Sequence, residues 1–589
     1  MKQFFKFMFA SMLGFFLTFV VIFAFFFMMI IGLASLSSKE VAIVNENSVF
    51  YLKLDEQIVE RATDNPLDNI DFMSFSSQKT FGLNQILESV KKAKTDDKIK
   101  GIFLELSSIP AGVASIEEIR NALIDFKTSG KFIYSYSEGY GQGAYYLASV
   151  SDKIYLNPQG SLDFRGLGGE IMFYKGLLEK LNVEVQVIRH GKFKSAVEPF
   201  ILDKMSDANR EQTMTYLNGI WNHILKGISD SRKITINDLT NIADSMSIRK
   251  ADDALALKFV DKLLYKDEVL AELNKKLGNT DKEKISFIGL SKYSKAPKKA
   301  EKSSKNKIAL IYAVGEIKSG EGDDKTIGSE GISKAIREAR LDENVKAIIL
   351  RVNSPGGSAL ASEIIWREVV LAKMAKKPVV VSMSDVAASG GYYIACAADK
   401  IVAEPNTITG SIGVFGLVPN MKGFFNNKLG ISFDYVKTNK HSDFGSVSRP
   451  LSASEKDFYQ TDVEYVYQTF IGHVANGRKM TVAQVDSIGQ GRVWCGVDAK
   501  RIGLVDELGG IDKAIEIAAK LAKLDTYRIL NLPKQKDPFA QIISQLSGEV
   551  DDVLLKSQLG DNYRYYEMIH NMSNVKGVQA RLPYDIKIN

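Results

Sequence analysis

A serine followed by two glycines stands where a strand-like run gives way to a helix-like one. The run Lys377–Met383 is rich in valine, whereas Ile394–Ala398 is small and apolar in the manner of a buried helix. Between them, Ser389-Gly390-Gly391 lets the backbone approach a ligand closely, and the first amides of a helix point outward. Ser389 is therefore a candidate nucleophile with the Gly390 amide beside it for a developing oxyanion. The alternative is that Ser389 only caps the helix.

The chain repeats itself at a period of about 245 residues. Five blocks recur in the same order, among them residues 98–106 with 344–352 and residues 143–148 with 390–395. A period of this length fits duplicated domains rather than short stacked repeats. In each copy, short Val/Ile-rich runs alternate with helical stretches, which is typical of parallel strands buried on both faces. We expect two α/β domains in tandem.

The two copies differ where chemistry would occur. Gln142 stands in the first copy where Ser389 stands in the second, and Ser442 stands in the second where Lys194 stands in the first. Each copy keeps one reactive side chain that the other copy lacks, as expected if residues from both copies form a single site. Lysine can act as a base for serine only when it is neutral, and burial lowers its pKa. Lys194 is the candidate base, although composition alone would make it an ordinary surface lysine.

A second oxyanion donor is expected after the strand at residues 346–352, where Pro355-Gly356-Gly357 stands. Either Gly356 or Gly357 could present its amide, and the same residues also suit a plain tight turn. Ser411, after the strand that begins near residue 399, is expected to hold the lysine by a hydrogen bond. His190 is close to Lys194 in sequence, but no spacing suggests a Ser/His/Asp triad.

Composition excludes several other classes of function. The 589 residues are 45% hydrophobic and 25% charged, as in ordinary globular proteins, and the net charge of +6 comes from well-mixed signs. No basic and aromatic face is concentrated enough to predict a nucleic-acid partner. Two cysteines and five scattered histidines form no disulfide framework and no metal-ligand pattern, so we expect neither a metal nor another cofactor.

The N-terminal segment predicts a lipid bilayer as a partner. Residues 7–38 carry no charge and contain the dense apolar run Phe15–Ile31, in a segment longer than the roughly 20 residues that a spanning helix needs. Lys2 and Lys6 precede it, so the N-terminus is expected in the cytoplasm and the rest of the chain on the other side. Small residues at 34–38 keep a cleaved signal peptide open as the alternative.

These patterns divide the chain into five parts. We expect a membrane anchor at 1–40, a first domain at 41–290, a basic linker at 291–306, a second domain at 307–533 and a C-terminal extension at 534–589. The extension contains a candidate amphipathic helix at Phe539–Leu559 and has no counterpart in the first copy. The sequence assigns it no function.

Four motifs resemble those of the signal peptide peptidase A family in its long, two-domain form. They are Lys194–Pro199, Asn353–Ser358, Ala388–Tyr392 and Thr409–Gly413, and the resemblance runs from the anchor to about residue 530. It departs from the family at Phe193 and Cys495, where Tyr and Thr are frequent.

This resemblance implies ClpP/crotonase-like domains, a Ser/Lys dyad made of Ser389 and Lys194, and no cofactor. It implies a serine endopeptidase, anchored in the bacterial inner membrane, that digests cleaved signal peptides and other membrane-derived peptides on the extracytoplasmic side. It also implies a homotetramer, and leaves open whether serine and lysine meet within one chain or between chains. The alternatives are a crotonase-type acyl-CoA hydrolase or hydratase, and an inactive membrane-anchored scaffold.

Overall fold

The structure is a computed structural model of the whole chain. It describes residues 2–36, 42–62, 70–71, 76–77, 80–280, 284–297, 304–535 and 578–582. The predicted helix at Phe539–Leu559, most of the extension and part of the basic linker lie outside the described residues.

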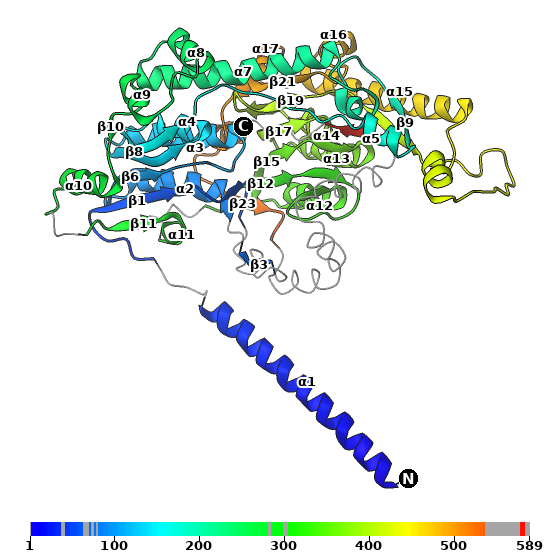
Figure 1. Cartoon of the computed structure of the whole chain (residues 1–589), viewed down its shortest axis with the longest axis horizontal. Helices are drawn as coiled ribbons and strands as arrows, with labels where there is room; N and C mark the ends of the chain where they lie inside the picture. Colours follow the sequence, from blue (N-terminus) through cyan, green and yellow to red (C-terminus); the bar gives the residue numbers. More distant parts are fainter. Residues whose placement is uncertain are drawn as a thin grey trace.

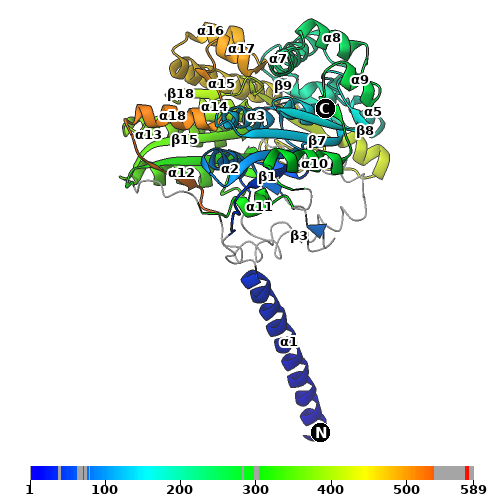
Figure 2. The ribbon, with the colours of Figure 1, turned by 90° about the vertical axis from the view of Figure 1, so that its left-hand side faces the viewer.

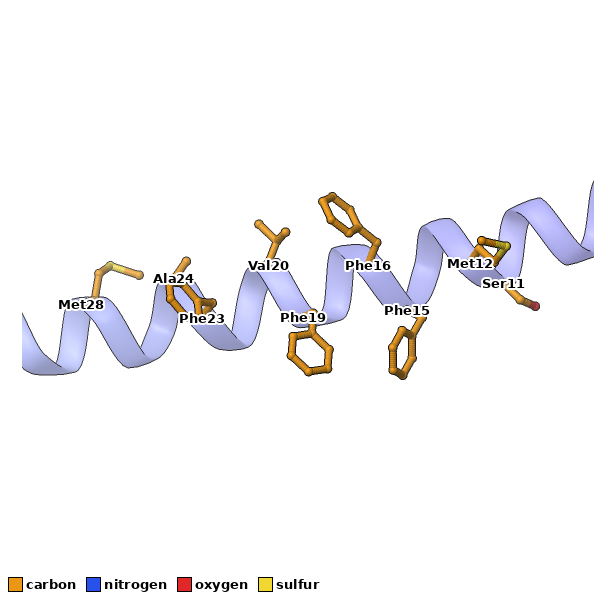
Figure 3. A pocket seen from close by; sticks show the side chains of 9 residues that line it. All are labelled: Ser11, Met12, Phe15, Phe16, Phe19, Val20, Phe23, Ala24 and Met28. Carbon is orange, nitrogen blue, oxygen red and sulfur yellow. The ribbon is translucent and has the colours of Figure 1, made fainter. Parts of the chain in front are cut away.

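Helix α1 (Lys2–Leu36) extends away from the rest of the chain (Figures 1 and 2). Its segment Gln3–Phe25 is long and apolar enough to cross a membrane, and none of it is buried against the protein. Figure 3 shows Met12, Phe15 and Phe19 among the side chains that project from this single helix. Such a surface is stable in hydrocarbon and costly in water, so it supports the predicted lipid contact.

The first copy forms a sheet of six parallel strands in the order β10-β8-β7-β6-β1-β11. The strands are β1 (Ser48–Lys53), β6 (Ile99–Glu105), β7 (Phe132–Tyr140), β8 (Lys153–Leu162), β10 (Lys262–Leu263) and β11 (Phe287–Gly289). The helices are α2 (Leu83–Thr95), α3 (Val113–Lys127), α4 (Gln142–Ala148), α5 (Lys175–Lys180), α6 (Glu198–Ile201), α7 (Asp207–Arg232), α8 (Ile236–Asp244), α9 (Ala251–Ala256), α10 (Lys266–Leu277) and α11 (Leu290–Tyr293).

The second copy repeats this order, as β22-β18-β17-β15-β12-β23, again with every pair parallel. Its strands are β12 (Lys307–Val314), β15 (Val345–Ser354), β17 (Val379–Ala388), β18 (Lys400–Ala403), β22 (Glu507–Leu508) and β23 (Arg528–Leu532), with β19 (Ile408–Gly410) and β21 (Val493–Cys495) added beyond the end of β17. Its helices are α12 (Ser329–Leu341), α13 (Ala359–Met374), α14 (Gly390–Ala395), α15 (Ala453–Arg478), α16 (Val482–Ile488), α17 (Gly496–Arg501) and α18 (Ile511–Leu521). The predicted tandem α/β fold is confirmed.

A third sheet joins the two copies, in the order β14-β13-β16-β24-β20-β9. Strand β9 (Glu184–Arg189) belongs to the first copy but pairs antiparallel with β20 (Phe415–Asn420) of the second. The other strands are β13 (Glu316–Lys318), β14 (Thr326–Gly328), β16 (Gly356–Ser358) and β24 (Gln579–Arg581; red in Figure 1). Because β9 crosses between the copies, the loop that follows it carries Lys194 to the end of β17.

A buried ionic cluster also joins the copies. Arg351 on β15 is almost fully buried, and its guanidinium contacts Glu60 at 2.8 Å and Glu118 at 2.5 Å, both from the first copy. Asp385 on β17 accepts hydrogen bonds from the amide and the hydroxyl of Ser115 at 2.9 and 2.7 Å. Buried charges are tolerated only when they are paired, so this cluster fixes one alignment of the two copies.

Candidate active site

Ser389 is held in a strained backbone conformation at the junction of β17 and α14. Its φ of 55° and ψ of −115° are unusual for a residue with a side chain. Its amide donates to Gly410 O at 2.8 Å, and its side chain makes no capping hydrogen bond to α14. The alternative that the Ser389 side chain caps helix α14 is therefore wrong. The sharp turn aims the Ser389 hydroxyl away from the helix and toward the lysine loop.

Lys194 meets Ser389 within one chain. Its Nζ lies 2.9 Å from Ser389 Oγ, 3.1 Å from Ser411 Oγ and 3.3 Å from Ser411 O. All three residues are fully buried, and the Phe415 ring centroid lies 5.8 Å from the amine. Burial without a counter-charge lowers the pKa of Lys194 well below its ordinary value. The amine is thus suited to accept a proton from the serine that it contacts.

The lysine loop is held by Gln212, a residue that no motif or spacing in the sequence distinguishes. Gln212 on α7 donates from Nε2 to Phe193 O at 3.1 Å and to Ser195 Oγ at 3.0 Å, on either side of Lys194. Its Oε1 accepts from Val493 N of the second copy at 3.1 Å. One side chain therefore ties the loop to both copies.

Close backbone packing confines the same loop from the other side. A Cβ on Gly491 would lie 2.6 Å from Lys194 Cα, and Gly491 has a φ of 84°. The Phe193 amide donates to Gln490 O at 2.9 Å. Only glycine suits position 491, because a side chain there would displace the loop that carries Lys194.

Glu198 holds the far end of the loop. Its buried carboxylate accepts hydrogen bonds from Ser206 N at 3.1 Å, Ser206 Oγ at 2.6 Å and Asn209 Nδ2 at 3.0 Å. These contacts attach the loop to the first turn of α7, and they keep the carboxylate away from the lysine amine. Glu198 therefore supports the loop's shape without neutralising Lys194.

Two backbone amides converge in front of Ser389. The Gly356 amide donates to Ser354 Oγ at 3.1 Å, so Gly357 is the better of the two predicted donors to an oxyanion. The Gly357 nitrogen lies 3.1 Å from the position that a Cβ on Gly390 would take. Gly356 has a φ of 100°, and a Cβ there would lie 2.7 Å from the Gly390 nitrogen. The glycines thus leave a small hole next to the Gly357 and Gly390 amides, as an oxyanion requires.

His190 belongs to a different arrangement. Its Nδ1 contacts Glu464 Oε2 at 2.7 Å, and its ring stacks on Tyr467 at 3.8 Å. The histidine ring therefore supports the packing of β9 against α15 rather than the serine. Within the described ranges, no group of three His, Cys, Asp or Glu side chains could hold a metal ion.

Comparisons with known proteins indicate the family of this chain. The family model described as Peptidase family S49 matches residues 125–280 and 372–525. Protease 4 of Salmonella typhi is 40% identical over 480 residues, which cover 80% of this chain and 77% of that protein. Serine protease SPPA, chloroplastic, of Arabidopsis thaliana is 34% identical over 509 residues, which cover 85% of this chain and 74% of that protein. ClpP1 from Listeria monocytogenes aligns over 34% of this chain and 91% of its own, at 19% identity and a TM-score of 0.23.

The class of protein follows from these matches. A duplicated α/β chain of this kind, matched over most of its length by serine proteases, is itself a serine peptidase. It belongs to peptidase family S49, whose model matches each of the two copies. The resemblance noted in the sequence is confirmed.

Proposed function

We propose that this chain is a membrane-anchored endopeptidase that uses Ser389 as nucleophile and Lys194 as general base. The observation that carries the proposal is the 2.9 Å contact between a fully buried, uncompensated amine and the serine hydroxyl. A neutral amine at this distance can take the hydroxyl proton as the oxygen attacks a carbonyl carbon. Ser411 orients the amine through its hydroxyl and its carbonyl oxygen.

The reaction proceeds through an acyl-enzyme. Attack by Ser389 Oγ forms a tetrahedral intermediate whose oxyanion accepts hydrogen bonds from the Gly357 and Gly390 amides. Lys194 then gives the proton to the leaving amine, and the peptide bond breaks. Water, deprotonated by the same lysine, hydrolyses the ester and restores Ser389. No metal or cofactor is required by any of these steps.

We propose that the substrates are cleaved signal peptides and other peptides derived from the membrane. Strands β16 and β20 border the serine, so an extended peptide can be bound by strand addition. Helix α1 would hold this groove near the bilayer, where apolar peptides collect. With Lys2 and Lys6 on the cytoplasmic side, the peptidase domains are on the extracytoplasmic side of the bacterial inner membrane. We also propose residues 41–290 and 307–533 as the bounds of the two peptidase domains.

We also propose a homotetramer, because one repeated segment is paired in the first copy and unpaired in the second. In the first copy this segment forms β9 (Glu184–Arg189), which pairs with β20 of the second copy. The matching residues 432–437 of the second copy adopt no regular structure, and Phe433 and Val436 are exposed. The same pairing repeated on the first copy of another chain would generate a closed ring. In detergent, Val436→Asp should reduce the assembly to smaller species in light scattering, and an unchanged mass would contradict this arrangement.

The proposed activity is tested with an internally quenched peptide and the full chain in detergent. Wild type should cleave it, while Ser389→Ala and Lys194→Ala should each lose nearly all activity and keep the wild-type unfolding midpoint. Full activity in a folded Lys194→Ala variant would reject the dyad. An acyl-CoA thioester serves as the competing substrate, and its hydrolysis without peptide cleavage would favour a crotonase-type hydrolase. Wild-type inactivity on both would favour a scaffold.

A further inference from the structure

Strand β9 is the last strand of the sheet that joins the two copies, so one of its edges has no strand beside it. Its other edge pairs antiparallel with β20, and His190 N donates to Val414 O at the end of this ladder. Hydrogen-bonded pairs alternate along an antiparallel ladder, so the even-numbered residues of β9 bond to β20. The amide and carbonyl groups of Val185, Val187 and Arg189 therefore point to the open edge, where no described residue bonds to them.

A cavity of about 430 Å³ lies between β9 and the first turns of α15. The residues that line it include Glu184, Gln186 and Val187 from the strand and Lys456, Asp457 and Gln460 from the helix. The Gln186 side chain is only 6% exposed, and its Oε1 accepts from Leu451 N at 3.1 Å. Its Nε2 has no partner among the described residues. An unpaired buried donor costs free energy, so a ligand that brings a carbonyl group to Gln186 is favoured.

An extended polypeptide is the ligand that matches these groups. A strand added along the open edge would pair its own amide and carbonyl groups with those of Val187, and would offer further carbonyl groups to Gln186. Recognition of this kind uses the main chain, so it suits unfolded peptides of many sequences.

The charges of the cavity favour a basic side chain in that polypeptide. Glu184 and Asp457 are acidic and Lys456 is basic, which leaves one negative charge uncompensated among the lining residues. Glu184 accepts a hydrogen bond from Asn420 Nδ2 at 2.8 Å, which is a neutral donor. Asp457 forms no ion pair with any described residue. One lysine or arginine in the ligand would balance the charge, whereas an acidic ligand would be repelled.

The open edge of β9 is within reach of a peptide that is bound at Ser389. A peptide that adds to β20 beside the serine lies on the edge of β20 opposite β9, so it is three strand spacings, roughly 14 Å, from a strand added to β9. About five extended residues cover this distance, and a few more allow the chain to turn at each end. A cleaved signal peptide has roughly 15–30 residues, with a basic stretch before its apolar stretch, and is long enough to occupy both places.

We propose that the open edge of β9 binds the basic N-terminal stretch of the same peptide whose apolar stretch is cut at Ser389, an inference that depends on the function proposed above. The basic stretch adds to β9 as a strand, and one lysine or arginine side chain enters the cavity that Glu184 and Asp457 line. This contact is the same before and during the reaction, so it lowers KM and leaves kcat unchanged.

The test compares three quenched peptides that share one cleavable apolar segment, with the full chain in detergent. The short peptide is that segment alone. The lysine peptide has an N-terminal extension of Thr-Lys-Thr followed by a flexible linker of about eight residues, and the glutamate peptide has Thr-Glu-Thr instead. For wild type, KM should be roughly 10-fold lower for the lysine peptide than for the glutamate peptide, with equal kcat. N-methylation of the amides in Thr-Lys-Thr should abolish this gain, because it prevents strand addition.

Variants of the cavity give the matching test on the protein. Glu184→Gln combined with Asp457→Asn should remove the difference between the lysine and glutamate peptides and leave cleavage of the short peptide unchanged. The glutamine can still accept the hydrogen bond from Asn420. Asp462→Asn is the matched control, because Asp462 is exposed on the same helix and does not line the cavity. This control should keep the full difference between the two peptides.

The outcomes separate this inference from the proposed function. Equal KM values for the lysine and glutamate peptides in wild type, or a gain that survives N-methylation or the double substitution, would overturn binding at β9 while cleavage of the short peptide continues. Wild-type inactivity on all three peptides would instead overturn the proposed function. Fluorescence anisotropy of the lysine and glutamate peptides with Ser389→Ala makes the same comparison without catalysis, and equal affinities there would also reject binding at β9.

Discussion

A carboxylate placed next to the lysine should suppress the peptidase in a way that alkaline pH reverses. Phe415 is the site for it, because its ring centroid lies 5.8 Å from Lys194 Nζ and it is almost fully buried. Phe415→Glu introduces a negative charge that favours the ammonium form of Lys194 and so raises its pKa. Phe415→Gln has nearly the same size and shape without the charge, and serves as the matched control.

The size of the effect follows from Coulomb's law. Two unit charges about 6 Å apart, in a protein environment with an effective dielectric constant of about 20, interact by about 3 kcal/mol. This corresponds to a roughly 100-fold smaller population of neutral amine at any pH where the amine is mostly protonated in both variants. Since only the neutral amine can act as the base, kcat/KM of Phe415→Glu should lie about 100-fold below that of Phe415→Gln on the acidic, rising part of the pH profile.

The assay is kcat/KM on the quenched peptide, measured from mildly acidic to alkaline pH. In wild type, burial lowers the pKa of Lys194, so activity should rise with pH and reach its plateau well below the pH at which free lysine titrates. Phe415→Glu should show the same rise displaced to higher pH and should approach the Phe415→Gln rate there. Superimposable pH profiles for the two variants would refute the assignment of Lys194 as the titrating base.

Three further substitutions test the parts of the site separately. Ser411→Ala should lower kcat about 5-fold with little change in KM, because it removes a hydrogen bond worth about 1 kcal/mol to the lysine. Ser411→Gly, which suits the φ of 49°, should lose as much activity with less loss of stability. Gln212→Ala should lower kcat and should reduce the free energy of unfolding by about 1–3 kcal/mol in urea titration, since four backbone and side-chain partners lose their hydrogen bonds. An unchanged urea midpoint would contradict its linking role. Arg351→Met should lower the free energy of unfolding by about 3–5 kcal/mol, because it leaves two buried carboxylates without their cation. Lys94→Met, at the exposed ion pair with Asp125, should lower it by less than about 1 kcal/mol. Equal losses of stability in urea titration would refute the role of the cluster.

The sequence predicted the tandem fold because both copies keep their apolar runs in the same order. It also predicted which side chains to pair, because Ser389 and Lys194 have no equivalent in the opposite copy. The sequence does not determine whether these two side chains meet within one chain or between chains. The placement depends on β9, whose alternating residues predict a strand but carry no signal for a partner that lies more than 200 residues away.

Other parts of the site have no local signal. Gln212 lies on an amphipathic helix like many polar residues, and its role appears only when three separate segments meet around it. The backbone of Ser389 takes a conformation that usually calls for glycine or asparagine, so the capping alternative could not be rejected from residue type. Strand β24 has three residues, two of them polar, and is too short to show any periodicity in the sequence. It is a strand because it pairs with β16 on one side and with β20 on the other.

The nucleophile itself can be identified by mass spectrometry after reaction with a fluorophosphonate, which forms a stable bond only with an activated serine. We expect one modified site, Ser389, in wild type, and no labelling in Ser389→Ala or in a folded Lys194→Ala variant. Labelling of a different serine, or undiminished labelling of Ser389 when Lys194 is alanine, would contradict it.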